Sequence, residues 1–108
     1  MSATDVLYID NTNNVWIDGL QNDISKAFVN NATCTIVEIL DASGAQVSGT
    51  ANISMTYKAT SDGDYYGALP YTVSLTEGAW YTVRARANDT DSNRGEWRRS
   101  CRAVYRNQ

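Results

Sequence analysis

Short apolar stretches separated by polar turn residues run along most of the chain. The stretches are rich in Val, Ile, Thr and Tyr, whereas Asn, Asp, Gly and Ser lie between them. This pattern is typical of β-strands joined by turns. Seven stretches occur, at about residues 6–10, 14–18, 33–40, 52–58, 64–69, 80–87 and 97–105. Seven short strands predict an all-β fold of the β-sandwich type.

Two of these stretches alternate regularly between apolar and polar residues, which predicts strands with one buried and one exposed face. The apolar positions are Ile53, Met55 and Tyr57 in one stretch, and Tyr81, Val83, Ala85 and Ala87 in the other. Arg84 and Arg86 fall on the opposite face of the second stretch. We therefore expect both arginines at the surface.

The other local signals are consistent with this division. The stretch 33–40 is apolar on both faces apart from Glu38, which favours a central strand or one with a bulge. The turn residues at 41–44 and 61–64 predict two hairpin connections. Helical spacing is limited to residues 21–28 and predicts at most one or two turns.

The length of 108 residues fits one domain, because either half alone would bury too small a core. We expect residues 1–20 to form an N-terminal arm or the first strands, and 21–108 to form the sandwich. No run approaches the roughly 18 apolar residues of a membrane span. Residues 1–5 lack the features of a signal peptide. These features predict a soluble protein made in the cytoplasm, with no membrane partner.

The charges are distributed unevenly along the chain. Residues 1–83 hold nine acids and two lysines, a net charge of −7, whereas residues 84–108 hold three acids and seven arginines, a net charge of +4. The two parts sum to the overall −3. The basic end could contact acidic surface elsewhere in the fold, stack on a neighbouring subunit, or form a solvated face of an edge strand.

Cys34 and Cys101 are the two cysteines of the chain. A disulfide between them would reduce the entropy of the unfolded chain. In a reducing compartment, however, buried cysteines commonly serve as small apolar residues. We expect two thiols, with the bridge as the alternative.

Leu75, Gly78 and Tyr81 follow one another at intervals of three positions, and Tyr81 is the second residue of the stretch 80–87. This spacing is the sequence form of a tyrosine corner, in which a buried Tyr returns its hydroxyl to upstream backbone. The glycine permits the tight crossing between sheets. The simpler alternative is a loop glycine followed by a core tyrosine. We treat these three residues as fold-defining for an immunoglobulin-like β-sandwich.

Several segments together carry a family resemblance. They are Asp23 with 32–35, then 40–44, then Asp-Gly-Asp-Tyr-Tyr-Gly-Ala-Leu-Pro at 62–70, then the corner at 75–81. In this order they resemble the immunoglobulin-like or fibronectin-type-III-like domains of tailed bacteriophage structural proteins, over about residues 20–106. The resemblance implies capsid decoration, or attachment at the neck or tail. One departure is that the domain fills nearly all of the given chain.

The residue inventory argues against catalysis. The chain has no histidine, which removes His-dependent nucleophile systems and most zinc sites. The Asp62/Asp64 and Asp89/Asp91 pairs could bind calcium or cleave glycosides, but aspartates in turns commonly bond backbone alone. We therefore predict no enzyme activity, no metal and no cofactor.

Nucleic acid is a further candidate partner, because arginines concentrate beside Trp97 and Tyr105. The acidic remainder of the chain, with a pI of about 4.7, would repel phosphate. We predict no nucleic-acid binding.

The sequence thus predicts a bacteriophage virion structural protein that docks onto capsid, neck or tail proteins in several copies. The candidate contact residues are Tyr8, Trp16, Arg98, Arg99, Arg102 and Arg106. One of the three tryptophans is expected in the core, and Trp16 as an exposed anchor. The alternative function is an adhesion or carbohydrate-binding module that displays Tyr65, Tyr66 and Trp80.

Overall fold

A computed structural model describes residues 6–21, 27–88 and 94–106 of the chain. These residues form an all-β fold without a helix. The strands are β1 (Val6–Tyr8), β2 (Asn13–Ile17), β3 (Thr33–Leu40), β4 (Ile53–Tyr57), β5 (Tyr65–Leu69), β6 (Trp80–Asn88) and β7 (Arg94–Val104). The described residues therefore contain no helix that could cross a membrane.

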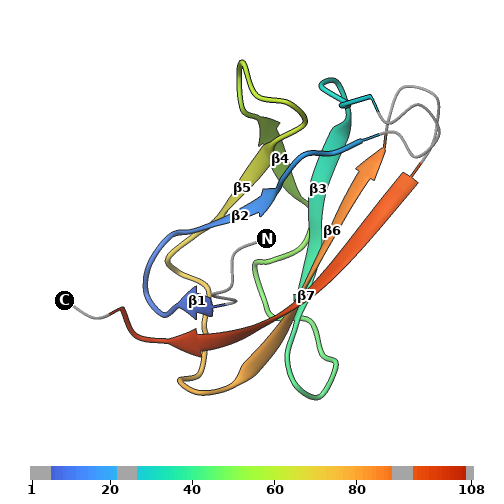
Figure 1. Ribbon diagram of the computed structural model, residues 1–108. Helices are drawn as coiled ribbons and strands as arrows, with labels where there is room; N and C mark the ends of the chain where they lie inside the picture. Colours follow the sequence, from blue (N-terminus) through green and yellow to red (C-terminus); the bar gives the residue numbers. More distant parts are fainter. Residues whose placement is uncertain (1–5, 22–26, 89–93, 107–108) are drawn as a thin grey trace.

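The seven strands form one mixed sheet in the order β1-β7-β6-β3-β4-β5-β2. β1 runs parallel to β7, and the other neighbouring strands are antiparallel. The sheet curls until it is nearly barrel-shaped, so that β2 faces the layer that contains β3, β6 and β7 (Figure 1). The two ends of the sheet, β2 on one side and β1 with β7 on the other, line the same pocket.

The sequence prediction of an all-β fold with seven strands is confirmed, and every predicted stretch overlaps one strand. The largest difference is at β7, which begins at Arg94 rather than near residue 97. The predicted helical turn falls partly on residues 22–26, outside the described residues. At its ends, Gln21 and Phe28 form an isolated antiparallel bridge.

β3 is a central strand and also contains a bulge, whereas its two-sided apolar pattern predicted one or the other. It pairs with β4 on one side and β6 on the other, and the register with β6 shifts between Ile36 and Glu38. Ile36 and Ile39 are both fully buried although they are three positions apart, a spacing that places side chains on opposite faces of a regular strand. The bulge explains this, because one extra residue reverses which face the following side chains occupy.

The core is aliphatic and contains tyrosine but no tryptophan among the described residues, so the expected core tryptophan is wrong. Tyr65, 1% exposed, has the largest of the fully buried side chains. Its hydroxyl donates to the Val29 carbonyl at 2.6 Å and accepts from the Ala32 N–H at 3.1 Å. These two hydrogen bonds satisfy the polar end of a ring that fills the centre of the core.

Cys34 and Cys101 are both buried as thiols, which agrees with the expectation of no bridge. Burial raises the pKa of the Cys34 thiol to about 11, because the thiolate would lose its hydration there.

Both predicted hairpin turns are formed. After β3, the Asp41 carboxylate accepts hydrogen bonds from the N–H groups of Ser43 and Ala45 at 2.9 and 3.0 Å. Before β5, Gly63 has a φ of +75°, and its carbonyl oxygen accepts a hydrogen bond from the Leu20 N–H at 2.9 Å. A Cβ on Gly63 would lie 2.6 Å from the backbone of Leu20, so only glycine fits this contact.

Candidate docking surface

The outer face of β1, β7 and β6 carries aromatic and basic side chains in adjacent positions. Arg102 of β7 lies opposite Trp80 of β6 on one side and Val6 of β1 on the other. Trp80 is 54% exposed and Arg102 is exposed. A large exposed indole beside a guanidinium is a composition enriched at protein interfaces.

Tyr8 and Arg106 extend this surface along the end of β7. Tyr8 is paired with Val104, so it lies on the same side of the sheet as Arg102. The Arg106 guanidinium lies over the Tyr8 ring, 5.6 Å from its centroid, in a cation–π contact. The Tyr8 backbone is held by Asn13, whose side-chain oxygen accepts from the Tyr8 N–H at 2.8 Å and whose amide donates to the Tyr8 carbonyl at 2.9 Å.

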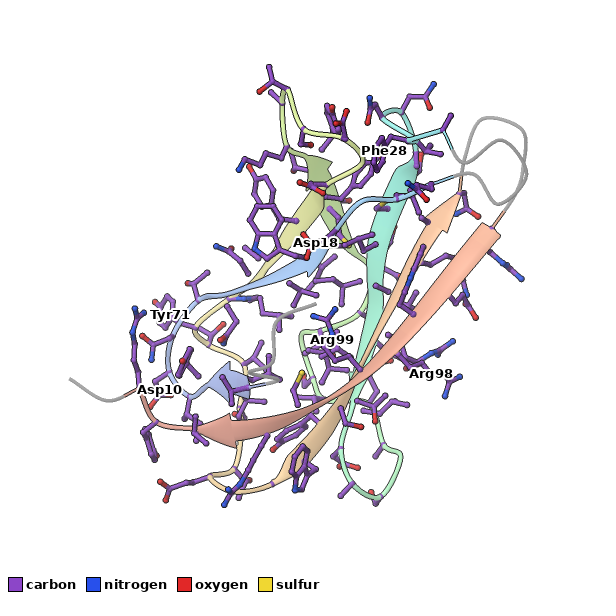
Figure 2. The ribbon with its side chains drawn as sticks, in the orientation of Figure 1. Asp10, Asp18, Phe28, Tyr71, Arg98 and Arg99 are labelled. Carbon is purple, nitrogen blue, oxygen red and sulfur yellow. The ribbon has the colours of Figure 1, made fainter. Side chains whose placement is uncertain are left out.

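Arg98 is the fifth member; it lies four residues before Arg102, and so on the same face of the strand. Figure 2 shows Arg98 pointing outward from β7, whereas the adjacent Arg99 points to the other side of the strand. We call the surface formed by Tyr8, Trp80, Arg98, Arg102 and Arg106 the docking face.

The structure therefore separates the six predicted contact residues. Tyr8, Arg98, Arg102 and Arg106 belong to the docking face. Arg99 and Trp16 do not, because Arg99 points to the other side of β7 and Trp16 lies on β2. Consecutive residues of a strand point to opposite sides, so Arg98 and Arg99 could not share a face.

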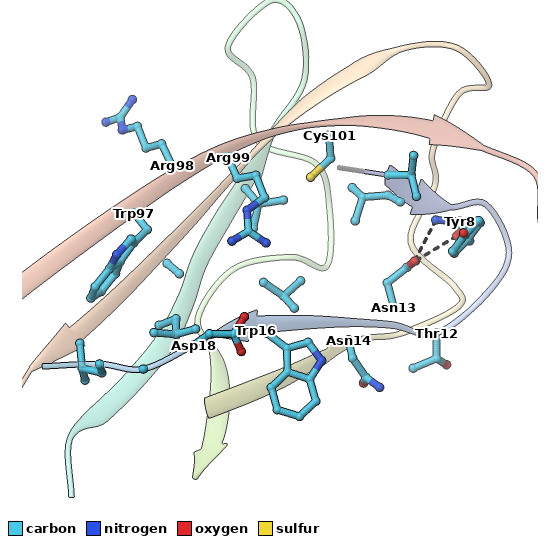
Figure 3. A pocket seen from close by; sticks show the side chains of 18 of the residues that line it. Tyr8, Thr12, Asn13, Asn14, Trp16, Asp18, Trp97, Arg98, Arg99 and Cys101 are labelled. Carbon is cyan, nitrogen blue, oxygen red and sulfur yellow. Dashed lines mark hydrogen bonds between the residues drawn. The ribbon is translucent and has the colours of Figure 1, made fainter. Parts of the chain in front are cut away.

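Arg99 lies in a groove of about 800 Å³ between the two ends of the sheet. Its side chain reaches from β7 into the groove, and Asp18, which follows β2, lies across from it (Figure 3). Trp97 lines the same groove on the β7 side and is 40% exposed. The buried side chains of Val83 and Ala85 contribute apolar lining to the groove.

Trp16 is on the outer face of β2, far along the sheet order from β7. Its ring packs against Tyr66 of β5 at a centroid separation of 5.2 Å. The Lys58 ammonium lies 5.8 Å from the Trp16 centroid. Trp16 is half-buried by these neighbours rather than displayed as an isolated anchor.

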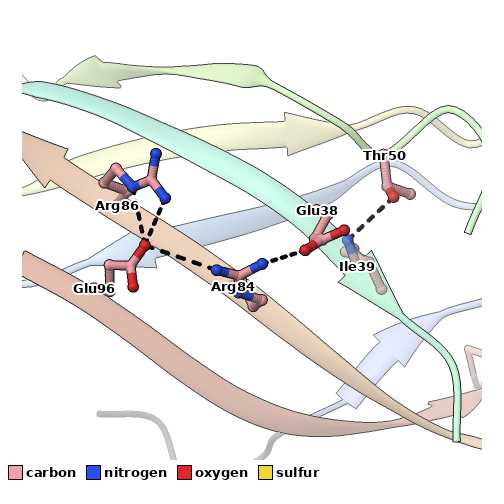
Figure 4. Close-up of polar contacts among 6 residues, drawn as sticks. All are labelled: Glu38, Ile39, Thr50, Arg84, Arg86 and Glu96. Carbon is pink, nitrogen blue, oxygen red and sulfur yellow. Dashed lines mark hydrogen bonds and ion pairs between the residues drawn. The ribbon is translucent and has the colours of Figure 1, made fainter. Parts of the chain in front are cut away.

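Glu38, Arg84, Glu96 and Arg86 form a polar network on the outer face of β3, β6 and β7 (Figure 4). Arg84 bonds to Glu38 and lies 3.7 Å from Glu96, and Arg86 donates to Glu96 at 2.7 Å. The hydrogen bond from Arg86 lowers the pKa of Glu96. Arg84 and Arg86 are thus half-buried in ion pairs.

The network shows what some of the arginines near the C-terminal end of the chain contact. Two of the arginines contact acids within the fold, while Arg94, Arg98 and Arg102 of β7 are exposed. From the sequence, Trp97 was considered only as a nucleic-acid contact, and Glu96 was not singled out. Both follow from extending the inward and outward alternation of β7 back to Arg94.

The corner residues lie at the start of β6. The Thr76 N–H donates to the Tyr81 hydroxyl oxygen at 2.8 Å, and the Tyr81 side chain is buried. Gly78 has a φ of +80°, and its N–H donates to the Ala103 carbonyl at 2.8 Å. Leu75 packs against the core. The corner therefore fixes the backbone that leads into Trp80 of the docking face.

The sugar-binding surface predicted as the alternative is not formed by its three residues. Tyr65 is in the core, and Tyr66 lies on β5, separated from Trp80 on β6 by β3 and β4. Tyr65 and Tyr66 are consecutive in one strand, so their rings point to opposite faces.

The aspartate pairs were weighed as metal ligands. Asp64 accepts a hydrogen bond from the Gly19 N–H at 2.8 Å, and Asp89 and Asp91 lie outside the described residues. Within the ranges that the structure describes, no group of three or more acidic or cysteine side chains could hold a metal ion.

Comparison with known proteins adds no identification. No family model, no curated protein and no solved structure matches this chain.

Proposed function

We propose that the chain is an immunoglobulin-like β-sandwich and a structural protein of a tailed-phage virion, where it docks onto capsid, neck or tail proteins as a small rigid subunit. The resemblance of its sequence segments to phage structural domains supports the virion assignment. The observation that carries the docking role is the face on which Trp80 and Arg102 lie side by side, exposed, with Tyr8 and Arg106 beside them.

The chemistry of this face suits an acidic protein partner. Arginine forms paired, charge-assisted hydrogen bonds with carboxylates, and tryptophan and tyrosine contribute large contact areas. Arg98 and Arg102 are both exposed, and no ion pair of either residue is formed within the described part of the chain. Their guanidinium groups are therefore available to carboxylates of a partner.

The strands beneath the face hold it in one conformation. β7 pairs with β6 from Trp80↔Arg102 to Asn88↔Arg94, and with β1 through three residue pairs. A surface built on paired strands loses little backbone entropy on binding. Weak contacts at each copy would suffice if many copies bind one particle, because avidity multiplies their effect.

The experiment is co-sedimentation of the purified chain with isolated heads and with isolated tails of the phage that encodes it. We expect the chain to pellet with one of the two substructures, with less binding as salt rises, because exposed charge pairs are screened. Retention on glycan columns without binding to either substructure would contradict the proposal.

A further inference from the structure

The outer face of β4, β5 and β2 carries a second surface, at the opposite end of the strand order from the docking face. Its centre is one row of paired residues, in which Tyr66 of β5 lies opposite Thr56 of β4 on one side and Trp16 of β2 on the other. The adjacent residues Tyr65 and Ile17 are buried, so Tyr66 and Trp16 point away from the core. Figure 3 shows the Trp16 ring directed from β2 away from β7. The row is therefore separate from both the docking face and the inside of the sheet.

Trp16 and Tyr66 form one creased apolar surface. Their ring centroids are 5.2 Å apart, and the ring planes are tilted by 38°. Both side chains remain partly exposed although they contact each other. The next outward pair along the two strands is Asn14 and Ala68, and both are short and exposed. An extended ligand can therefore lie along the strands, over the two rings and past these short side chains.

Hydrogen-bond donors of this row have no partners of their own. Within the described part of the chain, the Trp16 indole N–H, the Tyr66 hydroxyl and the Thr56 hydroxyl form no hydrogen bond. Indole and phenol groups usually find a hydrogen-bond partner when they become buried. A ligand that covers the row must therefore supply acceptors.

Lys58 adds a positive charge beside the rings. Its ammonium lies 5.8 Å from the Trp16 centroid, and it forms no ion pair within residues 6–21, 27–88 and 94–106. The Asp64 carboxylate, across the strand pair from Lys58, accepts from the Gly19 N–H instead. An exposed ammonium at this place is complementary to a carboxylate of a ligand.

A proline-rich segment with an adjacent acidic residue matches these features. In the polyproline II conformation the proline rings are apolar, the carbonyl groups have no internal hydrogen bonds, and the chain is already rigid before it binds. Segments of this kind bind aromatic-lined surfaces on several classes of domain. An uncharged sugar could also stack on one of the rings, but it would leave the Lys58 ammonium without a counter-charge. The charge therefore favours the acidic proline-rich segment.

We propose that Trp16, Tyr66, Thr56 and Lys58 form a binding site for a proline-rich segment that carries an acidic residue next to its prolines. A proline ring packs in the crease between Trp16 and Tyr66, the adjacent carbonyl accepts from the Trp16 indole N–H, and the acidic residue pairs with Lys58. The segment belongs to a partner protein other than the one bound by the docking face. The inference does not rest on the virion assignment, because none of these four residues belongs to the docking face.

The test is titration of the full chain with a synthetic peptide of about eight prolines followed by Glu-Glu, monitored through the indole N–H signals in two-dimensional NMR spectra. The chain has three tryptophans, and Trp16→Phe identifies the signal of Trp16. We expect this signal to shift with a dissociation constant of about 0.1 mM, while the Trp80 and Trp97 signals stay in place. A peptide with alanine in place of every proline should not shift it, because alanine lacks the rigid apolar ring.

Two single variants locate the site. Trp16→Ala should weaken binding of the proline peptide by at least about tenfold, because it removes one side of the crease and the indole donor. Trp80→Ala is the matched control, since Trp80 is 54% exposed and lies outside the site. It should bind the peptide like the wild type.

A charge exchange keeps the outcome decisive if Trp16→Ala fails to fold. Lys58 is exposed, so Lys58→Glu leaves the core unchanged. This variant should bind the Glu-Glu peptide about threefold more weakly than the wild type does. It should bind the same prolines followed by Lys-Lys more tightly than the wild type does.

Three results would overturn the proposal. The first is a Trp16 signal that does not move at about 1 mM proline peptide. The second is equal binding of the proline and alanine peptides. The third is a Trp16 signal that shifts with the oligosaccharide cellohexaose but not with the proline peptide, which would make this surface a sugar-binding site.

Discussion

Tyr81 connects the fold to the docking face at the scale of a single residue. Its hydroxyl oxygen accepts from the Thr76 N–H, and its ring is buried directly after Trp80. The hydroxyl therefore fixes the loop that enters β6 and, through it, the position of Trp80.

Tyr81→Phe removes this hydrogen bond while keeping the ring. We expect a loss of about 1–2 kcal/mol in the free energy of unfolding, because the Thr76 N–H loses its partner. Urea denaturation measures it, with Tyr71→Phe as the control because Tyr71 is 63% exposed. If the two variants are equally stable, the hydrogen bond between Thr76 and Tyr81 does not stabilise the protein.

Alanine substitutions at Gly63 and Gly44 compare the cost in stability of a close backbone contact with the cost of backbone strain alone. Both have positive φ, but a Cβ would meet Leu20 backbone only at Gly63 and nothing within 4 Å at Gly44. Gly44→Ala should cost about 1 kcal/mol from the left-handed conformation alone. Gly63→Ala should cost clearly more, measured by thermal unfolding. If the two costs are equal, the Leu20 contact contributes nothing.

The buried thiol of Cys34 should make the free energy of unfolding depend on pH. Its pKa is raised from 9.0 to about 11 by burial, so the unfolded chain ionises first as pH rises. The stability contribution of the neutral thiol is complete below about 9 and is lost progressively towards about 11. The difference in unfolding free energy between wild type and Cys34→Ala should therefore shrink between about pH 8 and about pH 10.5 under reducing conditions. A constant difference would contradict a buried thiol.

At the scale of the strands, the local pattern of apolar and polar residues was sufficient to locate the strands in the sequence, but not to predict which strands pair. The alternation in β4 and β6 correctly predicted their buried faces, since one face of each packs on the core. It could not predict the parallel pairing of β1 with β7, because that contact joins residues almost a hundred positions apart. The two-sided apolar pattern of β3 allowed a bulge, but it did not place the bulge between Ile36 and Glu38, so it could not fix the register.

The polar network across β3, β6 and β7 predicts a measurable contribution to stability. Arg84 and Glu38 are 19% and 20% exposed, so their pairing is less screened than a surface ion pair. Glu38→Gln should lower the free energy of unfolding by about 1–2 kcal/mol, as expected for a lost charge-assisted hydrogen bond.

Glu77→Gln is the matched control for Glu38→Gln, since Glu77 is exposed and outside the network. Chemical denaturation of both variants compares them. Equal losses would show that the network does not stabilise the sheet.

At the scale of the whole molecule, the docking face borders the groove, because Tyr8, Arg98 and Arg106 of the face also line the groove. Arg99 points to the other side of β7 from Arg98. The sequence predicted four of the five members of the docking face as contact residues. Its fifth member, Trp80, was assigned to sugar binding, because its position beside Arg102 depends on the β6–β7 register.

Binding of two charge-reversal variants to virion substructures tests the docking face most directly. Arg102→Glu changes the charge within the face, whereas Lys58→Glu makes the same change on the outer side of β4 and β5, beside Trp16. We predict that Arg102→Glu weakens co-sedimentation with the substructure that binds the wild type by about tenfold or more, because a favourable contact becomes repulsive. Lys58→Glu should bind like the wild type. Equal binding of Arg102→Glu and Lys58→Glu would contradict the docking face.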